Sequence, residues 1–387
     1  EECMQISKRT VLEFVTEGLL LFRLTQSPSF IARYDAVIID EMHERNKEQD
    51  LCICILRTYL KSIKDSIPNF KVVIMSASID SQRFSKYFDN CPIMDCPGRA
   101  FLVEETFLPI NILDQNVATQ VVNVLFKQIV EGFRDKPGDV LIFLCGVADI
   151  DECVALIQKR AQDQDRPISA FPLHSRLDPE SMRRATETDY RSNKNGMKRH
   201  KGIRKVICAT NIAETSLTID GVRFVIDCGR AKRMSYDQIL RSPALVEDWV
   251  SRASAIQRKG RAGRTAEGYC FYLYSKTKNM VDYDQPNILE EPVDELLLLS
   301  MELCGCSIEH LGLLDAPDQA KISNAQDRLV ELGFLKRDKT DNSVHLTAEG
   351  NVACSLSSTL RPESVRLILT CFKRYPHLSK KGIVLAV

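Results

Sequence analysis

The stretch Val37-Ile38-Ile39-Asp40-Glu41-Met42-His43-Glu44-Arg45-Asn46 decides how the rest of the chain is interpreted. Its β-branched apolar half is typical of a strand buried on both faces, so the two adjacent carboxylates mark a polar strand end. Sites in α/β proteins form at the carboxyl ends of parallel strands. Asp40 and Glu41 therefore predict a place for a metal ion and a phosphate, since one carboxylate can hold Mg²⁺ through its water shell while the other orients an attacking water. An exposed acidic pair that begins a helix is an equally good interpretation of these two residues alone.

Length, charge and cysteine usage limit the classes of protein that fit. A chain of 387 residues suggests two or three domains. Its 52 lysines and arginines balance 52 acids, so any surface for nucleic acid must be local. Fourteen scattered cysteines without a Cys-x-x-Cys pair indicate buried free thiols in a reducing compartment. No apolar run approaches the roughly 20 residues of a membrane span. We expect an intracellular protein, cytoplasmic or nuclear and not secreted, without a membrane partner.

Apolar runs that end in polar residues recur along the chain and predict an α/β fold with parallel sheets. The pattern appears before about residue 102 and again after it. From about residue 292 the sequence instead has helical periodicity without strand-like runs. Strands are expected at 10–15, 37–39, 70–75, 139–144, 169–174, 205–209 and 223–227. Helices are expected at 19–24, 50–63, 116–133, 150–159, 293–303, 321–332 and 362–372, and 333–335 with 344–346 predict the wing of a winged helix.

The segment Gln257-Arg258-Lys259-Gly260-Arg261-Ala262-Gly263-Arg264-Thr265 predicts the strongest anion site. Two arginines three residues apart share one face of a helix, and the glycines let the backbone approach a partner. Both guanidiniums could then reach a single polyphosphate, as arginine fingers do. A basic helix with salt-bridged arginines is the weaker interpretation.

Two further segments have a polar composition that suits nucleic acid. The segment 209–221 places small hydroxyl and amide side chains directly after a strand, which suits hydrogen bonds to a sugar-phosphate backbone. Helix caps explain the same residues equally well. The segment 191–205 carries lysines and arginines without an acid, and a solvated insertion explains it better than a phosphate-binding patch.

Taken together, these segments resemble the ordered motifs of DEAH/RHA-type (DExH) RNA helicases of superfamily 2. The resemblance covers nearly the whole chain. Asp40-Glu41-Met42-His43 resembles motif II, Ser76-Ala77-Ser78 motif III, Phe143-Leu144-Cys145-Gly146 motif IV, Thr210 to Gly221 motif V, Gln257 to Arg264 motif VI, Thr16-Glu17-Gly18 motif Ib, and Leu173-His174-Ser175 the serine-bearing segment after motif IV.

The resemblance implies two RecA-like domains, the first incomplete, followed by a winged helix and the start of a helical ratchet domain. The corresponding ranges are 1–102, 103–278, 279–348 and 349–387. It implies ATP and Mg²⁺ as cofactors and single-stranded RNA as a partner held by its backbone. Activator proteins acting on the C-terminal domains are a further implied class of partner.

The family's roles transfer to matching positions. Asp40 would hold Mg²⁺ and Glu41 would activate water, while His43, Ser76 and Ser78 would couple hydrolysis to strand movement. The RNA backbone would meet Thr16, Gly18, Gly146, Ser175, Thr210 and Asn211.

The second half would supply the remaining nucleotide contacts. Gln257 would position the water, and Arg261 and Arg264 would stabilise the charge on the γ-phosphate. Asp220 and Gly221 would lie near the nucleotide. The range 230–250, with Met234 and Tyr236, resembles the hairpin that separates strands.

Departures from the family pattern qualify these expectations. Met42 replaces the usual alanine at a position expected to face the interior, and Arg230 replaces the aromatic residue under the adenine, where a guanidinium can also stack. The phosphate-binding loop Gly-x-x-x-x-Gly-Lys-Ser/Thr does not occur in the sequence. We therefore expect a partial chain that hydrolyses ATP negligibly by itself. A non-catalytic RNA- or partner-binding protein and a DNA helicase are the alternative functions.

Overall fold

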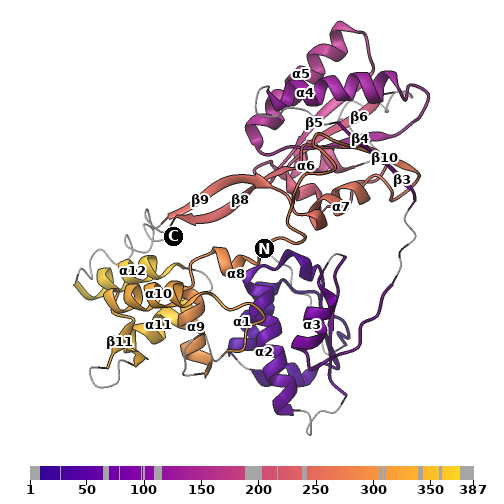
Figure 1. Cartoon of the computed structure of the whole chain (residues 1–387). Coiled ribbons are helices and arrows are strands. Elements are labelled where there is room, and N and C mark those ends of the chain that lie inside the picture. Colours follow the sequence, from indigo (N-terminus) through magenta and orange to yellow (C-terminus); the bar gives the residue numbers. More distant parts are fainter. Residues whose placement is uncertain are drawn as a thin grey trace. The chain divides into compact units, whose positions relative to one another are not determined.

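The computed structural model describes residues 9–26, 28–63, 69–77, 79–96, 98, 101–108, 116–187, 203–215, 217–237, 242–304, 308, 311–338, 343–356 and 360–374. The chain divides into two compact units (Figure 1). Unit 1 contains the residues up to Ser76, Asp80–Ile93 and those from Gln285 onward, and unit 2 contains Ala77–Ile79 and Met94–Asp284. The finer domain boundaries at 102, 278 and 348 stay predictions.

Unit 2 is built on a six-stranded, wholly parallel sheet with the strand order β3-β10-β7-β4-β6-β5. Every residue of β4 and β10 is buried, as expected of parallel strands covered on both faces, and apart from Asp139 no residue of either strand is charged. The strands are β3 (Val103–Phe107), β4 (Asp139–Phe143), β5 (Ile168–Leu173), β6 (Arg204–Ala209), β7 (Val222–Asp227) and β10 (Gly268–Tyr272).

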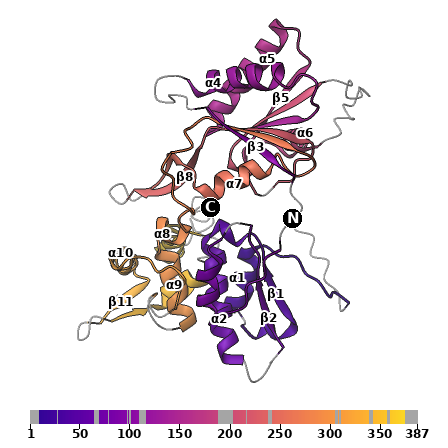
Figure 2. The same cartoon turned by 45° about the vertical axis from the view of Figure 1, so that its right-hand side comes forward.

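Helices cover both faces of this sheet (Figure 2). One face packs against α4 (Val117–Val124), the π-helix η3 (Leu125–Glu131) and α5 (Val147–Asp163). The other packs against α6 (Pro179–Thr186) and the turn that follows α7 (Arg252–Gly260). The helix predicted for 116–133 therefore forms, with its second half widened into a π-helix. The short η4 (Asn211–Ala213) follows β6.

A long antiparallel hairpin leaves the sheet after β7. Its strands β8 (Arg230–Asp237) and β9 (Ser242–Trp249) pair along their full length. Its side chains include exposed Met234, Leu245 and Val246. The hairpin predicted for 230–250 is present, and the side chain of Tyr236 lies outside the described residues.

The N-terminal part of unit 1 contains the parallel pair β1 (Ala36–Ile39) and β2 (Lys71–Ile74). The helices are α1 (Glu17–Gln26), η1 (Pro28–Arg33), η2 (Met42–Glu44), α2 (Lys47–Ile63) and α3 (Ser81–Tyr87).

The strand predicted for 10–15 is wrong. Those residues form no ladder with another described segment, and the side chains of Val11 and Phe14 are 96% and 89% exposed. Alternating residues need a neighbouring strand to become a sheet. The segment is instead fixed by Glu13, whose carboxylate accepts hydrogen bonds from Arg23 Nη1 at 2.7 Å and Tyr34 Oη at 2.5 Å.

The C-terminal part of unit 1 packs on α2. Leu51 and Cys54 of α2 share one apolar core with Leu296 to Leu299 and with the later helices. The elements are α8 (Asn287–Glu290), α9 (Asp294–Cys304), α10 (Gln319–Glu331), β11 (Leu335–Arg337), β12 (Val344–Leu346), α11 (Ala348–Leu356) and α12 (Pro362–Arg374). The antiparallel β11–β12 pair follows α10, as expected of a winged helix.

The predicted free thiols are confirmed for Cys52, Cys54, Cys208 and Cys228, which are all buried and unbridged. Among the described residues, no helix is long and apolar enough to cross a membrane.

Candidate functional site

The acids of the opening stretch lie where two strands of unit 1 end. Strand β1 stops at Ile39 and the parallel β2 at Ile74, and Met75 N donates to Ile39 O at 2.8 Å. Met42 N then donates to Met75 O at 3.0 Å, which folds the chain after Glu41 back toward the end of β2. Met42 is fully buried, as predicted. Residues 40–43 therefore lie beside Ser76.

One turn brings three predicted residues together. Glu41 has φ 51° and ψ 36°, and the left-handed backbone starts the three-residue turn η2. In this turn His43 Nδ1 lies 3.4 Å from Glu41 Oε2 and 3.3 Å from Ser76 Oγ. The imidazole thus links the predicted water activator to the end of the next strand. Ser78 lies outside the described residues.

Asp40 is exposed, and its carboxylate oxygens can accept further hydrogen bonds or bind a cation. Its Oδ1 accepts one hydrogen bond from Glu41 N at 2.8 Å. Gln49, which is fully buried, donates its amide to the backbone oxygens of Asp40 and Glu41 at 3.3 and 3.4 Å and so fixes the peptide under both acids. In the described part of the chain, no three His, Cys, Asp or Glu residues gather as a metal site. The donor set fits Mg²⁺, which commonly takes one or two carboxylates, water and substrate phosphates.

The predicted RNA contacts of unit 2 lie at one edge of its sheet. Gly146, Ser175 and Thr210 follow the carboxyl ends of β4, β5 and β6, which are adjacent parallel strands. Asn211 begins the short turn after Thr210. The sheet therefore brings these four residues to a common edge.

Lys232 is an additional cation at that edge. A Cβ added to Gly146 would lie 2.8 Å from Lys232 Nζ, so the missing side chain leaves room for the ammonium group. Lys232 belongs to β8, almost ninety residues further along, and the motif pattern gave no sign of it.

Asp220 and Gly221 precede β7 and so lie at the opposite, amino edge. Gly221 has φ +84°, a conformation that side chains rarely adopt, and its carbonyl accepts a hydrogen bond from Asp139 N at 2.9 Å. Arg230, the other predicted nucleotide contact, lies after the carboxyl end of β7. The fold does not bring it beside Asp220.

The arginines of motif VI do not share a helix face, contrary to the prediction. Helix α7 ends at Gly260, and Arg261 and Arg264 lie in the turn that follows. Gly260 and Gly263 favour such a turn over a continued helix. Arg264 is exposed and Gln257 is half-buried on α7.

Arg261 is 4% exposed and its guanidinium is already engaged. Nε donates to Glu214 O at 2.7 Å and Nη1 donates to Leu217 O at 2.6 Å, both in the motif V segment. In this conformation the guanidinium of Arg261 joins motif VI to motif V.

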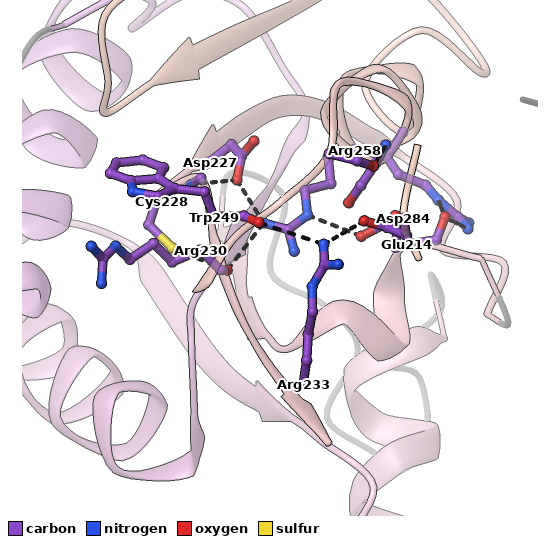
Figure 3. Close-up of polar contacts among 12 residues, drawn as sticks. Glu214, Asp227, Cys228, Arg230, Arg233, Trp249, Arg258 and Asp284 are labelled. Carbon is purple, nitrogen blue, oxygen red and sulfur yellow. Dashed lines mark hydrogen bonds and ion pairs between the residues drawn. The ribbon is translucent and has the colours of Figure 1, made fainter. Parts of the chain in front are cut away.

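The arginine that sequence reasoning missed is Arg258, which is fully buried (Figure 3). Its Nη1 donates to Asp227 Oδ1 at 2.8 Å and its Nε to Glu214 Oε2 at 3.0 Å. Tyr274 Oη also donates to Asp227, at 3.1 Å. The network joins α7, motif V and the end of β7.

The charges of this network depend on one another. Burial by itself lowers the pKa of Arg258, but Asp227 and Glu214 outweigh it and the pKa lies above its ordinary value. Burial raises the pKa of Glu214, against the opposing effect of Arg258. An aspartate that closes a buried strand was the available signal in the sequence, because such a carboxylate needs a cation.

Arg230 is held in the hairpin. Its guanidinium carbon lies 4.8 Å from the Trp249 ring centroid, and Nη1 lies 2.7 Å from Glu247 Oε1, as Figure 3 partly shows. The guanidinium of Arg230 thus already stacks on Trp249 in this structure, and its stacking on an adenine base stays a prediction.

The residues predicted in the motif Ib region lie at the start of α1. Thr16 O accepts from Leu20 N at 3.0 Å and its hydroxyl oxygen accepts from Leu19 N at 3.4 Å, so Thr16 caps the helix. Gly18 has open space where a Cβ would be. Residues 191–202 of the basic segment lie outside the described part of the chain.

Known proteins match both the sequence and the fold. Residues 120–266 match the helicase conserved C-terminal domain. The chain is 34% identical over 358 residues to the probable ATP-dependent RNA helicase DHX34 of Homo sapiens, covering 90% of this chain and 30% of that protein. It is 32% identical over 370 residues to the ATP-dependent RNA helicase HrpA of Escherichia coli, covering 95% of this chain and 27% of that protein.

A solved structure extends the agreement to the whole fold. The crystal structure of the Escherichia coli DEAH/RHA helicase HrpB superposes with a TM-score of 0.81 at 28% identity, covering 98% of this chain and 45% of that one. The chain spans less than a third of the length of the two curated relatives. In its motifs, its helicase conserved C-terminal domain at residues 120–266 and its fold, the chain is similar to DExH-type helicases.

Proposed function

We propose that this chain contributes to an ATP-dependent RNA helicase, or ribonucleoprotein-remodelling ATPase, that couples ATP hydrolysis to movement along single-stranded RNA. The observation that carries the proposal is the contact of His43 with both Glu41 and Ser76, at 3.4 and 3.3 Å. A protein that only bound RNA would have no need for a linkage between a water activator and a second strand end.

The chain's own residues divide the chemistry. Glu41 accepts the proton of the attacking water, while His43 holds the Glu41 carboxylate in place. Asp40 would hold Mg²⁺ through the water shell of the ion, and the bound ion would neutralise phosphate charge. Gln257 positions the attacking water through its side-chain amide.

Arg264, which is exposed, stabilises charge on the γ-phosphate. Arg261 does the same only after its hydrogen bonds to the motif V carbonyls are exchanged. Asp220 and Gly221 on one side of β7, and Arg230 on the other, stay separate proposed nucleotide contacts. Ser76 and Ser78 are the proposed coupling residues.

RNA binds through its backbone in this proposal. The common edge formed by Gly146, Ser175, Thr210 and Asn211, with Lys232 beside it, suits phosphate and ribose oxygens. Thr16 and Gly18 supply further backbone contacts from unit 1. Since contacts to the RNA backbone do not distinguish one base from another, RNA targets are selected by other surfaces of the protein. Activator proteins also bind other surfaces. An intracellular, cytoplasmic or nuclear, location agrees with the free buried thiols.

Glu41→Gln in the full-length protein tests the proposal. Loss of a general base should lower RNA-stimulated ATP hydrolysis by roughly 10²- to 10⁴-fold, and RNA affinity measured by fluorescence anisotropy should not change. The matched control is Glu44→Gln, which changes an exposed acid of the same turn. Turnover that is unchanged in Glu41→Gln contradicts the proposal.

The ATP hydrolysis assay also distinguishes an RNA helicase from a DNA helicase. Stimulation by single-stranded RNA and DNA of equal length is compared in wild-type protein. Equal or greater stimulation by DNA would favour a DNA helicase.

A further inference from the structure

Arg45 ends the turn that carries His43, and it does so in an unusual backbone conformation. Its φ of 47° and ψ of 40° are left-handed, as are those of Glu41 on the other side of Met42–Glu44. Neither residue is glycine, so both conformations cost free energy and persist only where the surroundings hold them. The position of His43 therefore depends on what fixes Arg45.

The side chain of Arg45 is fixed by two carboxylates. Nε and Nη2 donate to the two oxygens of Asp50 at 2.7 and 3.1 Å, and Nη2 also donates to Asp315 Oδ2 at 2.6 Å. Arg45 is 8% exposed, and its guanidinium carbon lies 5.4 Å from the Phe84 ring centroid. Asp50 is local, on α2, but Asp315 lies 270 residues further along the chain.

The C-terminal part of unit 1 also fixes the backbone of Arg45. Its carbonyl accepts a hydrogen bond from Asn287 N at 3.1 Å, where α8 begins. Two separate C-terminal segments thus hold one residue of the catalytic turn, one through the main chain and one through the side chain.

Asp315 is itself held firmly. Its other carboxylate oxygen accepts a hydrogen bond from Arg83 of α3. The residues before it are anchored as well, because Gly312 O accepts from Tyr87 Oη at 2.8 Å and Leu311 O accepts from Cys54 Sγ at 2.9 Å. Segment 311–315 is therefore a fixed support and not a loop that follows Arg45.

We propose that Asp315 is a positioning residue for the catalytic turn: it holds Arg45 in its left-handed conformation and thereby keeps His43 and Glu41 aligned with Ser76. The inference rests on the proposed function, because it assigns Asp315 to the ATP hydrolysis carried out by Glu41. It makes the C-terminal segment at 311–315 a determinant of kcat.

Asp315→Asn in the full-length protein tests this role. The variant keeps the shape of the side chain and removes its charge, while Arg45 keeps Asp50. We expect kcat for RNA-stimulated ATP hydrolysis to fall roughly ten- to hundredfold, because small misplacements of catalytic groups have effects of this size. The KM for ATP should stay within about twofold, because Asp315 touches no proposed nucleotide contact.

A second measurement does not depend on turnover. Amide hydrogen exchange of residues 41–45, in protein without nucleotide, should accelerate in Asp315→Asn, while exchange in α9 and α10 should not. The control variant is Asp327→Asn, which breaks an exposed ion pair with Arg337 in the same part of unit 1 and should change neither readout.

Asp315→Glu provides a variant that keeps the charge. It should fold even if Asp315→Asn does not, and its longer side chain should give a smaller fall in kcat. An unchanged kcat in a folded variant would overturn the proposal, and so would a fall in kcat with uniformly faster exchange throughout unit 1, which indicates a structural role only. If wild-type protein shows no RNA-stimulated turnover, the proposed function fails, and the exchange at 41–45 still decides whether Asp315 fixes the turn.

Discussion

Two buried arginines, Arg258 of unit 2 and Arg45 of unit 1, each bind two carboxylates, yet they connect very different parts of the chain. Arg258 is fully buried and its partners Asp227 and Glu214 lie 31 and 44 residues away, inside the same sheet domain. Arg45 joins a residue five positions away to one 270 positions away.

The difference indicates two uses of the same chemistry. Around Arg258 the ion pairs are part of the core of unit 2. They stabilise the sheet and its hairpin without any contribution from unit 1. Around Arg45 they join the turn that carries His43 to a remote C-terminal segment. We therefore expect loss of Arg258 to affect stability first, and loss of the Arg45 contacts to affect the geometry of the turn first.

The largest expected effect is that of Arg258→Met. The apolar side chain leaves Asp227 and Glu214 buried without a cation, and breaking a buried pair in this way costs about 3–5 kcal/mol. Urea unfolding followed by far-UV circular dichroism measures the change. Asp227 also holds Gly229 N at 2.9 Å and Tyr274, so the base of the hairpin should loosen together with the sheet.

Arg252→Met is the matched control for that variant. Arg252 lies on the same helix, its side chain is 59% exposed, and its ion pair with Asp282 spans 3.4 Å. Exposed pairs contribute about 0–1 kcal/mol, so this variant should unfold almost as wild type does. A loss in Arg258→Met no larger than that of the control would contradict the comparison.

A smaller effect is expected from Asp50→Asn, and it should depend on pH. Burial raises the pKa of Asp50 from 3.8 to about 6, although Arg45 acts in the opposite direction. Between those two values the folded protein binds more protons at this carboxyl than the unfolded chain does. Relative to Asp50→Asn, wild-type protein should therefore lose about 1–3 kcal/mol of stability as the pH rises from 4 to 6.

Urea unfolding of both proteins at pH 4, 5, 6 and 7 checks the sign of this difference. Groups common to the two proteins cancel in the comparison. If the difference instead grows in favour of wild type as the pH rises, then Arg45 governs the charge of Asp50 more strongly than burial does.

The sequence predicted best those features that depend on neighbouring residues. The buried strands β4, β6 and β7 were located because each contains an uninterrupted apolar run, at 140–143, 206–209 and 224–226, and the turn at Asp40 because the polarity changes there. Strand β3 was missed, since Glu104 and Glu105 interrupt its apolar pattern and, among the described strands, its one partner is β10, more than 160 residues away. The run 10–15 was predicted as a strand because alternation is visible, whereas the absence of a pairing partner is not.

Residue identity was also insufficient where a side chain's role depends on a distant partner. Of the two motif VI glycines predicted to allow close backbone approach, Gly263 does so, since a Cβ there would lie 2.8 Å from Phe101 O, whereas Gly260 has open space where a Cβ would be. Arg261 was assigned to a helix face, but the helix ends at Gly260. The contact between Arg45 and Asp315 depends on how the C-terminal part packs against α2 and α3. No spacing within motif II could indicate it.

The smallest effect is expected for a network that also has three charged groups but lies near the surface. Glu349, on α11, also has two cationic partners, Lys373 and Arg366, but Lys373 is 66% exposed. Lys373 and then Arg366 lower the pKa of Glu349 below its ordinary 4.5, so the stabilisation is present above that value and is lost as the pH falls further. Glu349→Gln should cost only about 0.2–1 kcal/mol at pH 7, less in high salt, and progressively less as the pH falls below 4.5. A loss approaching that of Arg258→Met would mean that the number of charged partners, and not their burial, determines how much such a network contributes.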